Sequence, residues 1–391
     1  MKEKFLRELA DIQTGPFGSQ LHKEDYVADG TPIVTVEHLG NKMFSEQNLP
    51  RVSNTDKNRL KKYVLKQGDI VFSRVGSVDR CSYVDQEHDG WMFSGRCLRV
   101  RPTSEIDSEY LYYYFCLEET KQFVRNIAVG ATMPSINTKL LGEVVVTFPE
   151  LEQQKRISGI LSAIDSKIEV NQKINDNLYA QVKAIFSKNF LDLDFLPDGW
   201  KTGNLLDIAD YLNGLAMQKY RPKDGETGLP VLKIKELRQG ICDASSELCS
   251  PSIKSEYIIH DGDIIFSWSG SLLVDIWCGG NCGLNQHLFK VTSNNYDKWF
   301  YYLWTAHHLD RFIAVAADKA TTMGHIKREE LEKVEVIIPS KCDYKRIGAL
   351  IKPLFDLIIS NRIENRKLTA LRNTLLPKIM AGEIDVSDIQ L

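Results

Sequence analysis

The sequence predicts an α+β fold in which two similar mixed α/β domains are joined by two long antiparallel helices that form a coiled coil. Three observations support this. The chain has 391 residues, more than one hydrophobic core usually organises. It repeats itself at an offset of 190 residues, and each copy ends in an apolar 3,4 alternation. Since there are only two copies, we expect a pseudo-dimer rather than a solenoid of stacked units.

Short matching motifs carry the repeat. Thr132-Met133 recurs as Thr322-Met323, and further upstream, where the offset drifts by a few residues, Gly68–Ser73 corresponds to Gly262–Ser267. The matches continue through the long helical stretch of each copy. They predict four segments: a first domain over 1–150, a first helical spacer over 151–190, a second domain over 196–340 and a second helical spacer over 341–391.

Each predicted domain combines short strands with an aromatic helix. The predicted strands are β-rich runs bounded by Gly, Pro and Asn, at 32–36, 69–72, 144–148, 264–266 and 334–338. Aromatic residues at helical spacing fill 110–116 in the first copy and 299–304 in the second. We expect both aromatic stretches to lie in the hydrophobic cores, because buried aromatic rings usually pack.

The two helical spacers show heptad patterns. The predicted a positions are Ile157, Ile164, Asn171, Leu178 and Ile185 in the first helix, and Ile347, Leu354, Asn361, Leu368 and Leu375 in the second. The predicted d positions are Ile160 and Ile174, then Leu350, Leu357 and Leu371. A helix of this length would extend roughly 55 Å and would act as a spacer between the two domains; one turn of B-DNA is roughly 34 Å, so domains at its ends could reach separated sites on one duplex.

A single asparagine interrupts the apolar seam at the same place in each copy. Asn171 and Asn361 occupy equivalent a positions. A lone polar residue at such a position fixes the register, because a slipped pairing buries its amide without a partner. We expect the two asparagines to face each other across an antiparallel pair; the alternative is that both point to solvent or to a partner protein.

The charge of the chain is nearly balanced, but basic residues cluster in both copies. The net charge is -3, which argues against a free-standing protein that binds DNA tightly. Residues 51–80 contain eight basic and three acidic side chains, and residues 219–238 contain six and three. Either cluster could be a solvated surface or a contact for DNA phosphates.

Several classes of site and location are not indicated. The eight cysteines lack paired C-x2-C spacing, and Cys278-x3-Cys282 with His287 lacks a fourth ligand, so we expect reduced thiols, no metal and no cofactor. No Gly-Lys dipeptide or nucleophile motif occurs, so we expect no active site. With no long apolar run and no signal-peptide pattern, the expected location is the cytoplasm and no membrane partner is expected.

Three motifs together resemble a known family. They are Pro149-Glu150-Leu151-Glu152-Gln153-Gln154-Lys155-Arg156-Ile157, Leu196-Pro197-Asp198-Gly199-Trp200 and Leu375-Leu376-Pro377-Lys378-Ile379-Met380-Ala381-Gly382-Glu383-Ile384. They look like the opening of the central helical region, the start of the second recognition domain and the ending of the specificity subunit of Type I restriction-modification enzymes. The resemblance covers essentially the full chain.

The resemblance implies a non-catalytic subunit with two target recognition domains, each reading one half of a bipartite double-stranded DNA sequence. The helices would act as spacers and as docking surfaces for two DNA methyltransferase (modification) subunits, and motor/endonuclease (restriction) subunits would then join. The sequence departs from the pattern at Ser340-Lys341-Cys342-Asp343-Tyr344, which replaces the Glu-Gln pair of the first copy. Docking at the second copy could therefore differ.

The loops after the matched strands are the candidates for DNA contacts. Arg74, Ser77 and Arg80 lie in the first such loop, and arginines there could bridge guanine O6 and N7. Trp268 and Ser271 lie in its counterpart, so that one scaffold with different tips would read two different half-sites. The basic candidates outside these loops are Lys57, Arg59, Lys219, Arg221, Lys233 and Lys235.

Other interpretations stay open at this point. The candidate loops could be ordinary Gly/Ser turns, since turns favour these residues. A second loop pair, 132–135 and 321–325, could contact DNA or simply cap helices. The alternative function is a coiled-coil adaptor that scaffolds partner proteins without reading DNA. Charge reversal at Arg74 and Arg80 would distinguish the two, because an adaptor would keep its assembly and lose nothing else.

Overall fold

The computed structural model describes the chain except residues 17, 19, 41, 319–325, 387–388 and 390–391. The chain forms two compact units, and each is described by itself. Unit 1 comprises Met1–Ser166 with Thr369–Leu391, and unit 2 comprises Lys167–Leu368. Each unit therefore combines one predicted domain with segments of both long helices. The predicted domain boundaries follow the chain and remain predictions.

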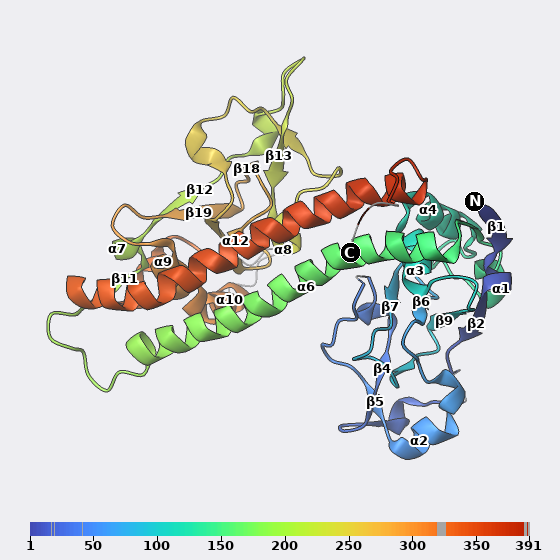
Figure 1. Ribbon diagram of the computed structural model, residues 1–391. Coiled ribbons are helices and arrows are strands. Elements are labelled where there is room, and N and C mark those ends of the chain that lie inside the picture. The colour runs from blue at the N-terminus through green and yellow to red at the C-terminus, as the bar shows by residue number, and fades with distance from the viewer. Residues whose placement is uncertain (17, 19, 41, 319–325, 387–388, 390–391) are drawn as a thin grey trace. The chain divides into compact units, whose positions relative to one another are not determined.

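Unit 1 is built from three small sheets (Figure 1). The central antiparallel sheet has the order β2-β9-β6-β7, formed by Ala10–Thr14, Cys97–Pro102, Ile70–Ser73 and Cys81–Tyr83. A second sheet has the order β3-β5-β4-β8, formed by Tyr26–Val27, Arg51–Val52, Thr31–Val34 and Met92–Phe93. β1 (Lys2–Phe5) pairs with β10 (Val145–Phe148). The helical elements are α1 (Leu6–Leu9), η1 (Lys23–Asp25), η2 (Val36–His38), α2 (Asn54–Arg59), η3 (Lys61–Tyr63), α3 (Ser108–Cys116), α4 (Glu118–Ile127) and α5 (Thr138–Leu141).

Unit 2 repeats this arrangement. Its central antiparallel sheet has the order β12-β19-β16-β17, formed by Asp210–Asn213, Leu288–Thr292, Asp263–Ser267 and Leu273–Trp277. Its second sheet has the order β14-β13-β18-β15, formed by Leu248–Cys249, Leu229–Leu232, Cys282–Leu284 and Ile258–Ile259. β11 (Lys201–Asn204) pairs with β20 (Glu335–Ile338). The helical elements are α7 (Leu205–Ile208), η5 (Met217–Lys219), α8 (Ile234–Gln239), η6 (Ser255–Tyr257), α9 (Lys298–His307), α10 (Leu309–Asp318) and α11 (Glu329–Glu332).

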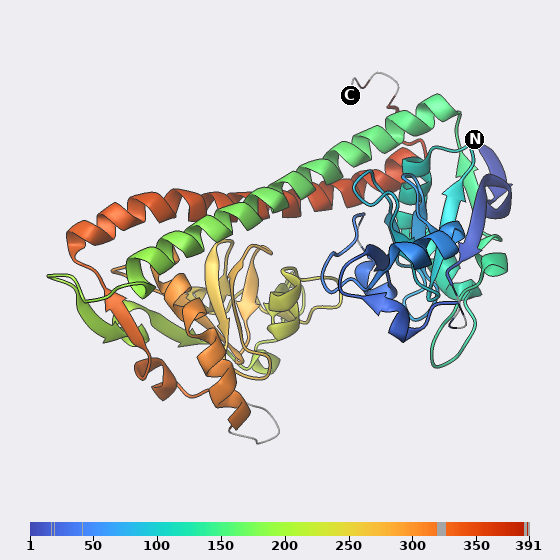
Figure 2. The same cartoon turned by 90° about the horizontal axis from the view of Figure 1, so that it is seen from below.

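The shared topology confirms the internal repeat and the α+β fold. In both units a parallel pair sits in the second sheet, β4 with β8 and β13 with β18. Figure 2 shows the strands of unit 2, coloured yellow-green to orange, on one side of the helix segments that belong to the same unit. A mixed sheet covered by helices on one face is a normal way to bury the apolar side of short strands.

The aromatic stretches form the cores, as the sequence predicts. In unit 1, Tyr110, Tyr113 and Phe115 of α3 are almost fully buried against the central sheet. In unit 2, Trp299 and Trp304 of α9 occupy the equivalent place. Burying an aromatic ring removes about 150–250 Å² from water, so each helix anchors its sheet with a few side chains.

The two long helices are α6 (Leu151–Phe186) and α12 (Lys341–Met380), and both begin at equivalent positions of the repeat. α6 continues into the short π-helical turn η4 (Ser187–Leu191). Inside unit 2 the helices run antiparallel, because the side chain of Asn171 contacts Asn365 while that of Asn175 contacts Asn361. The predicted antiparallel coiled coil is therefore present.

The predicted partner of the register asparagines is wrong. Asn171 Nδ2 donates to Asn365 Oδ1 at 2.8 Å, and Asn361 Nδ2 donates to Asn175 Oδ1 at 2.9 Å. Each predicted asparagine thus pairs with a residue one helical turn away from the expected partner. The reason is that the pseudo-twofold axis passes between Asn171 and Asn175, which the heptad pattern cannot locate. Setting the helix register remains a predicted role for this buried polar layer.

Four of the five predicted d positions also need correction, whereas Ile160 is half-buried against the core of unit 1. Ile174 is 40% exposed on α6, and Leu350, Leu357 and Leu371 are 52%, 44% and 48% exposed on α12. The buried seam of α6 instead passes through Leu161, Asn175 and Val182, one residue after the predicted d positions. The predicted a positions can form an apolar seam either with the d positions or with the residues that follow the d positions. The heptad pattern alone therefore did not decide which of these two sets faces the partner helix. The true arrangement leaves an apolar stripe uncovered.

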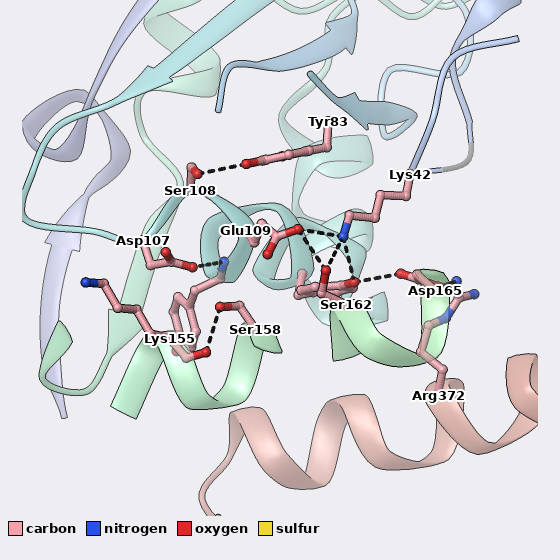
Figure 3. Close-up of polar contacts among 12 residues, drawn as sticks. Lys42, Tyr83, Asp107, Ser108, Glu109, Lys155, Ser158, Ser162, Asp165 and Arg372 are labelled. Carbon is pink, nitrogen blue, oxygen red and sulfur yellow. Dashed lines mark hydrogen bonds and ion pairs between the residues drawn. The ribbon is translucent and has the colours of Figure 1, made fainter. Parts of the chain in front are cut away.

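Polar networks attach each domain to its own helix segments. In unit 1, Lys42 Nζ donates to Glu109 Oε1 at 2.6 Å and to Ser162 Oγ at 2.8 Å, as Figure 3 shows. In the same close-up, Arg372 Nη1 donates to Asp165 Oδ1 at 2.6 Å. Asp165 is buried, so this charge-assisted bond offsets part of its desolvation.

In unit 2, two arginine–aspartate ion pairs join the domain to its segment of α12. Arg362 makes two bonds of 2.8 Å to Asp275, and Arg366 makes two bonds of 2.8 Å to Asp261. Two-point pairing of a guanidinium with a carboxylate fixes orientation as well as distance.

Within the described residues, no helix is both long enough and apolar enough to cross a lipid bilayer.

Candidate nucleic-acid interface

Loops from separate parts of unit 1 meet where β2, β6 and β9 come together. Arg74 N donates to Arg96 O at 2.8 Å, and Ile136 N donates to Arg74 O at 2.9 Å. Gly76 N donates to Pro134 O at 2.8 Å. These bonds tie together three loop segments, 74–80, 94–96 and 134–136, which we call the first tip.

Unit 2 brings the equivalent loops together through one shared backbone bond and one side-chain contact. Ile326 N donates to Trp268 O at 3.0 Å, as Ile136 does to Arg74. The hydroxyl of Ser269 lies 3.0 Å from His287 Nδ1 and links the next loop to this one. The equivalent segments, 268–272 and 285–287 with Ile326, are called the second tip. The predicted loop 321–325 lies outside the described residues.

The backbone contacts define which side chains correspond. Gly15 N donates to Cys97 O as Gly214 N donates to Leu288 O, which makes Arg96 the equivalent of His287. Arg74 corresponds to Trp268, because the carbonyl of each accepts a hydrogen bond from an equivalent amide, that of Ile136 or Ile326. Arg80 corresponds to Leu273, because each faces the last residue of the preceding strand. Three arginines of the first tip are thus replaced by an indole, a leucine and an imidazole.

The predicted residues of the first tip lie together. Arg74 is half-buried and its Nη1 donates to Gly95 O at 3.2 Å, while Ser77 and Arg80 are exposed. Gly76 has φ +76°, which favours glycine at this sharp turn. Arg125 of α4 donates to Asp79 at 2.6 Å and anchors the loop from below. The loop is therefore held in place while its outer side chains remain accessible.

Lys57 and Arg59 lie on α2, which follows strand β5 of the second sheet of unit 1. Arg59 bonds Asp56 through Nε and Nη2, and this hydrogen bonding lowers the pKa of the Asp56 carboxyl. Arg59 Nη1 also donates to Gln20 O at 2.8 Å, in the segment that follows β2. The guanidinium of Arg59 is thus engaged within the protein, and Lys57 is half-buried.

The basic candidates of unit 2 are mostly paired with acidic side chains. Arg221 and Lys233 lie 3.6 Å and 3.1 Å from Glu247, and the hydrogen bond from Lys233 is the main cause of the lowered pKa of that carboxyl. Lys235 Nζ donates to Ser245 at 3.1 Å, and Lys219 is exposed at the end of η5. Such surface pairs contribute little stability and can exchange for phosphate.

Lys233 and Lys235 are positively charged at positions whose equivalents in unit 1 are uncharged or acidic. Ser94 N donates to Val34 O as Asn285 N donates to Leu232 O, so the residues after these strands correspond. Lys233 is then the equivalent of Thr35, and Lys235 that of Glu37. Positive charge therefore moves from the arginine-bearing loops in unit 1 to the start of α8 in unit 2.

Trp268 contributes less to the outer surface than the sequence suggested. It is half-buried, its ring centroid lies 5.7 Å from that of Phe289, and its Nε1 donates to Asn213 Oδ1 at 3.1 Å. Ser271 is exposed, and its carbonyl accepts a bond from Ser267 Oγ at 3.0 Å. The second tip is therefore an aromatic surface with a polar rim.

Arg96 is the residue at the first tip that sequence reasoning missed. It is exposed and borders a surface pocket of about 540 Å³, together with Tyr26, Thr35, Glu37 and Ser94. It forms no ion pair with any described residue. The repeat did not reveal that Arg96 corresponds to His287, because the offset between the two copies changes along the chain. It is 194 residues at the hairpins of Arg74 and Trp268 but 191 residues at Arg96 and His287.

The cysteine and histidine candidates do not assemble into a metal site in the described part of the chain. Cys278 and Cys282 are buried, and His287 instead contacts Ser269 in the second tip. Burial raises the pKa of the Cys278 thiol. Among the described residues, no group of three or more His, Cys, Asp or Glu side chains is placed to hold a metal ion.

Residues 1–180 and 197–371 match the family described as the Type I restriction modification DNA specificity domain. The MjaIX specificity subunit of a Type I restriction enzyme from Methanocaldococcus jannaschii is 28% identical over 315 residues, covering 74% of this chain and 72% of that protein. The HindI specificity subunit from Haemophilus influenzae is 20% identical over 403 residues, covering 83% and 88%.

One solved structure has a similar fold over nearly the whole chain. The crystal structure of a Type I restriction-modification system S subunit from M. genitalium matches with a TM-score of 0.58 and 16% sequence identity. The match covers 97% of this chain and 95% of that chain. At this level of identity the likeness supports the fold alone.

Proposed function

Because this chain belongs to the family of Type I restriction-modification DNA specificity subunits, we propose that its two domains each read one half of a bipartite DNA target. The observation that carries the proposal is the pair of tips. They share the backbone bonds that Ile136 and Ile326 donate to Arg74 and Trp268, but the side chains at equivalent positions differ in charge and shape. A constant scaffold with variable tips is what two separate sequence-reading elements require.

In this proposal the phosphate contacts come from basic residues beside the tips. Lys57 and Arg59 would serve the first domain, and Lys219, Arg221, Lys233 and Lys235 the second. Such contacts position the protein on the duplex without selecting a sequence. The internal ion pairs of Arg59, Arg221 and Lys233 would then exchange for phosphate when DNA binds. The coiled-coil adaptor is not favoured, because the family match spans both domains.

The exposed stripe of the long helices supports a docking role. Leu350 and Leu357 are seven residues apart on α12, and Leu371 follows fourteen residues later with Glu364 at the position between them, so the three leucines lie toward one face of that helix. Several large exposed leucines on one face of a helix mark a surface for a protein partner. We assign this stripe to a modification subunit, and expect two such subunits, joined by restriction subunits. The specificity chain itself would contribute no catalysis and would act in the cytoplasm, beside the DNA.

The docking prediction uses Leu357→Glu. A buried, unpaired carboxylate at the centre of the stripe should prevent the modification subunit from docking. We therefore expect the wild-type chain to bind a duplex carrying its target tightly only with modification subunits present, and the Leu357→Glu chain to bind as weakly as the chain alone. Size-exclusion chromatography and fluorescence anisotropy would measure assembly and DNA binding.

The matched control is Ile313→Glu on α10. Ile313 is 45% exposed and Leu357 is 44% exposed, so both substitutions place a charge at a similar apolar surface position. The control should assemble and bind DNA as the wild type does. Normal assembly by Leu357→Glu would remove the docking assignment, whereas failure of the assembled wild-type complex to bind any duplex would remove the DNA-reading function.

A further inference from the structure

Resting on the proposed function, we infer that Arg96 is the guanine-reading residue of the first domain. The inference starts from the comparison of the two tips. All three arginines of the first tip, Arg74, Arg80 and Arg96, lack an arginine at the equivalent position of the second tip. Residues that vary on a constant backbone are the ones that can change specificity.

The three arginines are not equally available. Arg74 is half-buried and already donates to Gly95 O, which holds its guanidinium against the protein. Arg80 lies along the backbone of Gly40, since a Cβ atom added at Gly40 would come within 2.7 Å of its Nη2. Arg96 is exposed, and no described acidic side chain pairs with it. Its fork of N–H donors is therefore the one that can turn toward a base.

The surroundings of Arg96 suit a base edge in the major groove. A planar guanidinium can donate two parallel hydrogen bonds to guanine O6 and N7, the commonest specific contact in protein–DNA complexes. The Arg96 carbonyl accepts from Arg74 N, and Cys97 N donates to Ser94 O, so the backbone on both sides of the side chain is fixed. Fixing the backbone lowers the entropy lost when the side chain engages the base.

The second tip cannot make the same contact in the same way. The side chain of His287 lies 3.0 Å from Ser269 Oγ, and Trp268 Nε1 donates to Asn213. Leu273, the counterpart of Arg80, is apolar. The second domain thus reads its half-site with other groups, and the Arg96 guanine belongs to one half-site only.

Selection of duplexes from a randomised library by the assembled complex tests the assignment. Arg96→Lys keeps the charge but loses the planar fork. It should relax the preference for guanine at one position of one half-site by roughly tenfold or more, and leave the other half-site unchanged. Arg96→Ala should relax the same position and also reduce the salt dependence of binding by about one unit of slope.

Arg7→Lys on α1 is the matched control, because Arg7 is an exposed arginine paired with Glu143 outside the tip. It should return the wild-type motif. If Arg96→Lys and Arg96→Ala both return the wild-type motif, Arg96 is not the guanine reader and the proposed function stands. If the assembled wild-type complex enriches no motif at all, the proposed function fails together with the inference.

Discussion

Reversing the charges of Arg74 and Arg80 together is expected to lower the affinity of the assembled complex for its target duplex by at least about 100-fold. Both residues lie in the hairpin loop of the first tip, and each reversal removes a positive group and places a negative one near phosphates. Assembly with the modification subunits should be unaffected, because neither residue lies on the long helices. Anisotropy titrations at several salt concentrations would give the affinity and the salt slope.

The control for this experiment is Lys2→Glu with Lys4→Glu, which changes the net charge by the same amount. Both lysines lie on β1 and form surface ion pairs, Lys2 with Glu150 and Lys4 with Glu105. Such pairs contribute about 1 kcal/mol or less, so the control should fold and bind DNA nearly as the wild type does. Equal losses in the two double variants would mean that the tip charges act only through the overall field.

The second large effect concerns stability. Phe190→Ala should lower the free energy of unfolding of unit 2 by about 3–5 kcal/mol, because it leaves a cavity in a core that cannot close around it. Phe190 is 1% exposed, and its ring lies 5.7 Å from that of Trp200 and 6.0 Å from that of Trp304. It joins the end of α6 to the start of the second domain.

Tryptophan fluorescence during denaturation would follow this change directly. Five of the six tryptophans, all except Trp91, lie in unit 2, and three of them, Trp200, Trp299 and Trp304, contact the ring of Phe190. Phe195→Ala is the matched control, since Phe195 lies five residues away and is 78% exposed. It should change stability by no more than about 0.5 kcal/mol. Similar midpoints for the two variants would contradict the packing described for the end of α6.

The sequence predicted the parts of the fold that depend on local pattern. The repeat located the start of α6 and α12, because an unbroken offset of 190 runs through both helices. The aromatic stretches around Tyr110 and Trp299 were placed in the cores, since so many rings at helical spacing have few other places to go. These features are set by residues close together in the chain.

What the sequence did not predict depends on how segments align in space. Asn171 bonds Asn365 rather than Asn361 because the pseudo-twofold axis falls half a turn from the expected place. Leu357 and other predicted d positions are exposed because the apolar pattern is compatible with two different buried seams along the helix. Only the packing of the folded chain decides which of the two seams is buried. A pattern of period 3.5 defines a stripe to within about one residue.

The candidate site was half visible in the sequence. Arg74, Ser77 and Arg80 follow a recognisable strand, and the matched glycines led to Trp268 and Ser271. Arg96 and His287 escaped because insertions and deletions lie between them and the nearest matched motif. Their equivalence follows from hydrogen bonds across the sheet, through Cys97 and Leu288, and such bonds join residues distant in the chain.

The most direct test of the central claim is the sequence motif that the assembled wild-type complex selects from randomised duplexes. If two domains of one chain each read a half-site, the selected duplexes will contain two blocks of preferred bases, separated by a constant number of positions without preference. A single continuous block, or no preferred bases at all, would contradict the account.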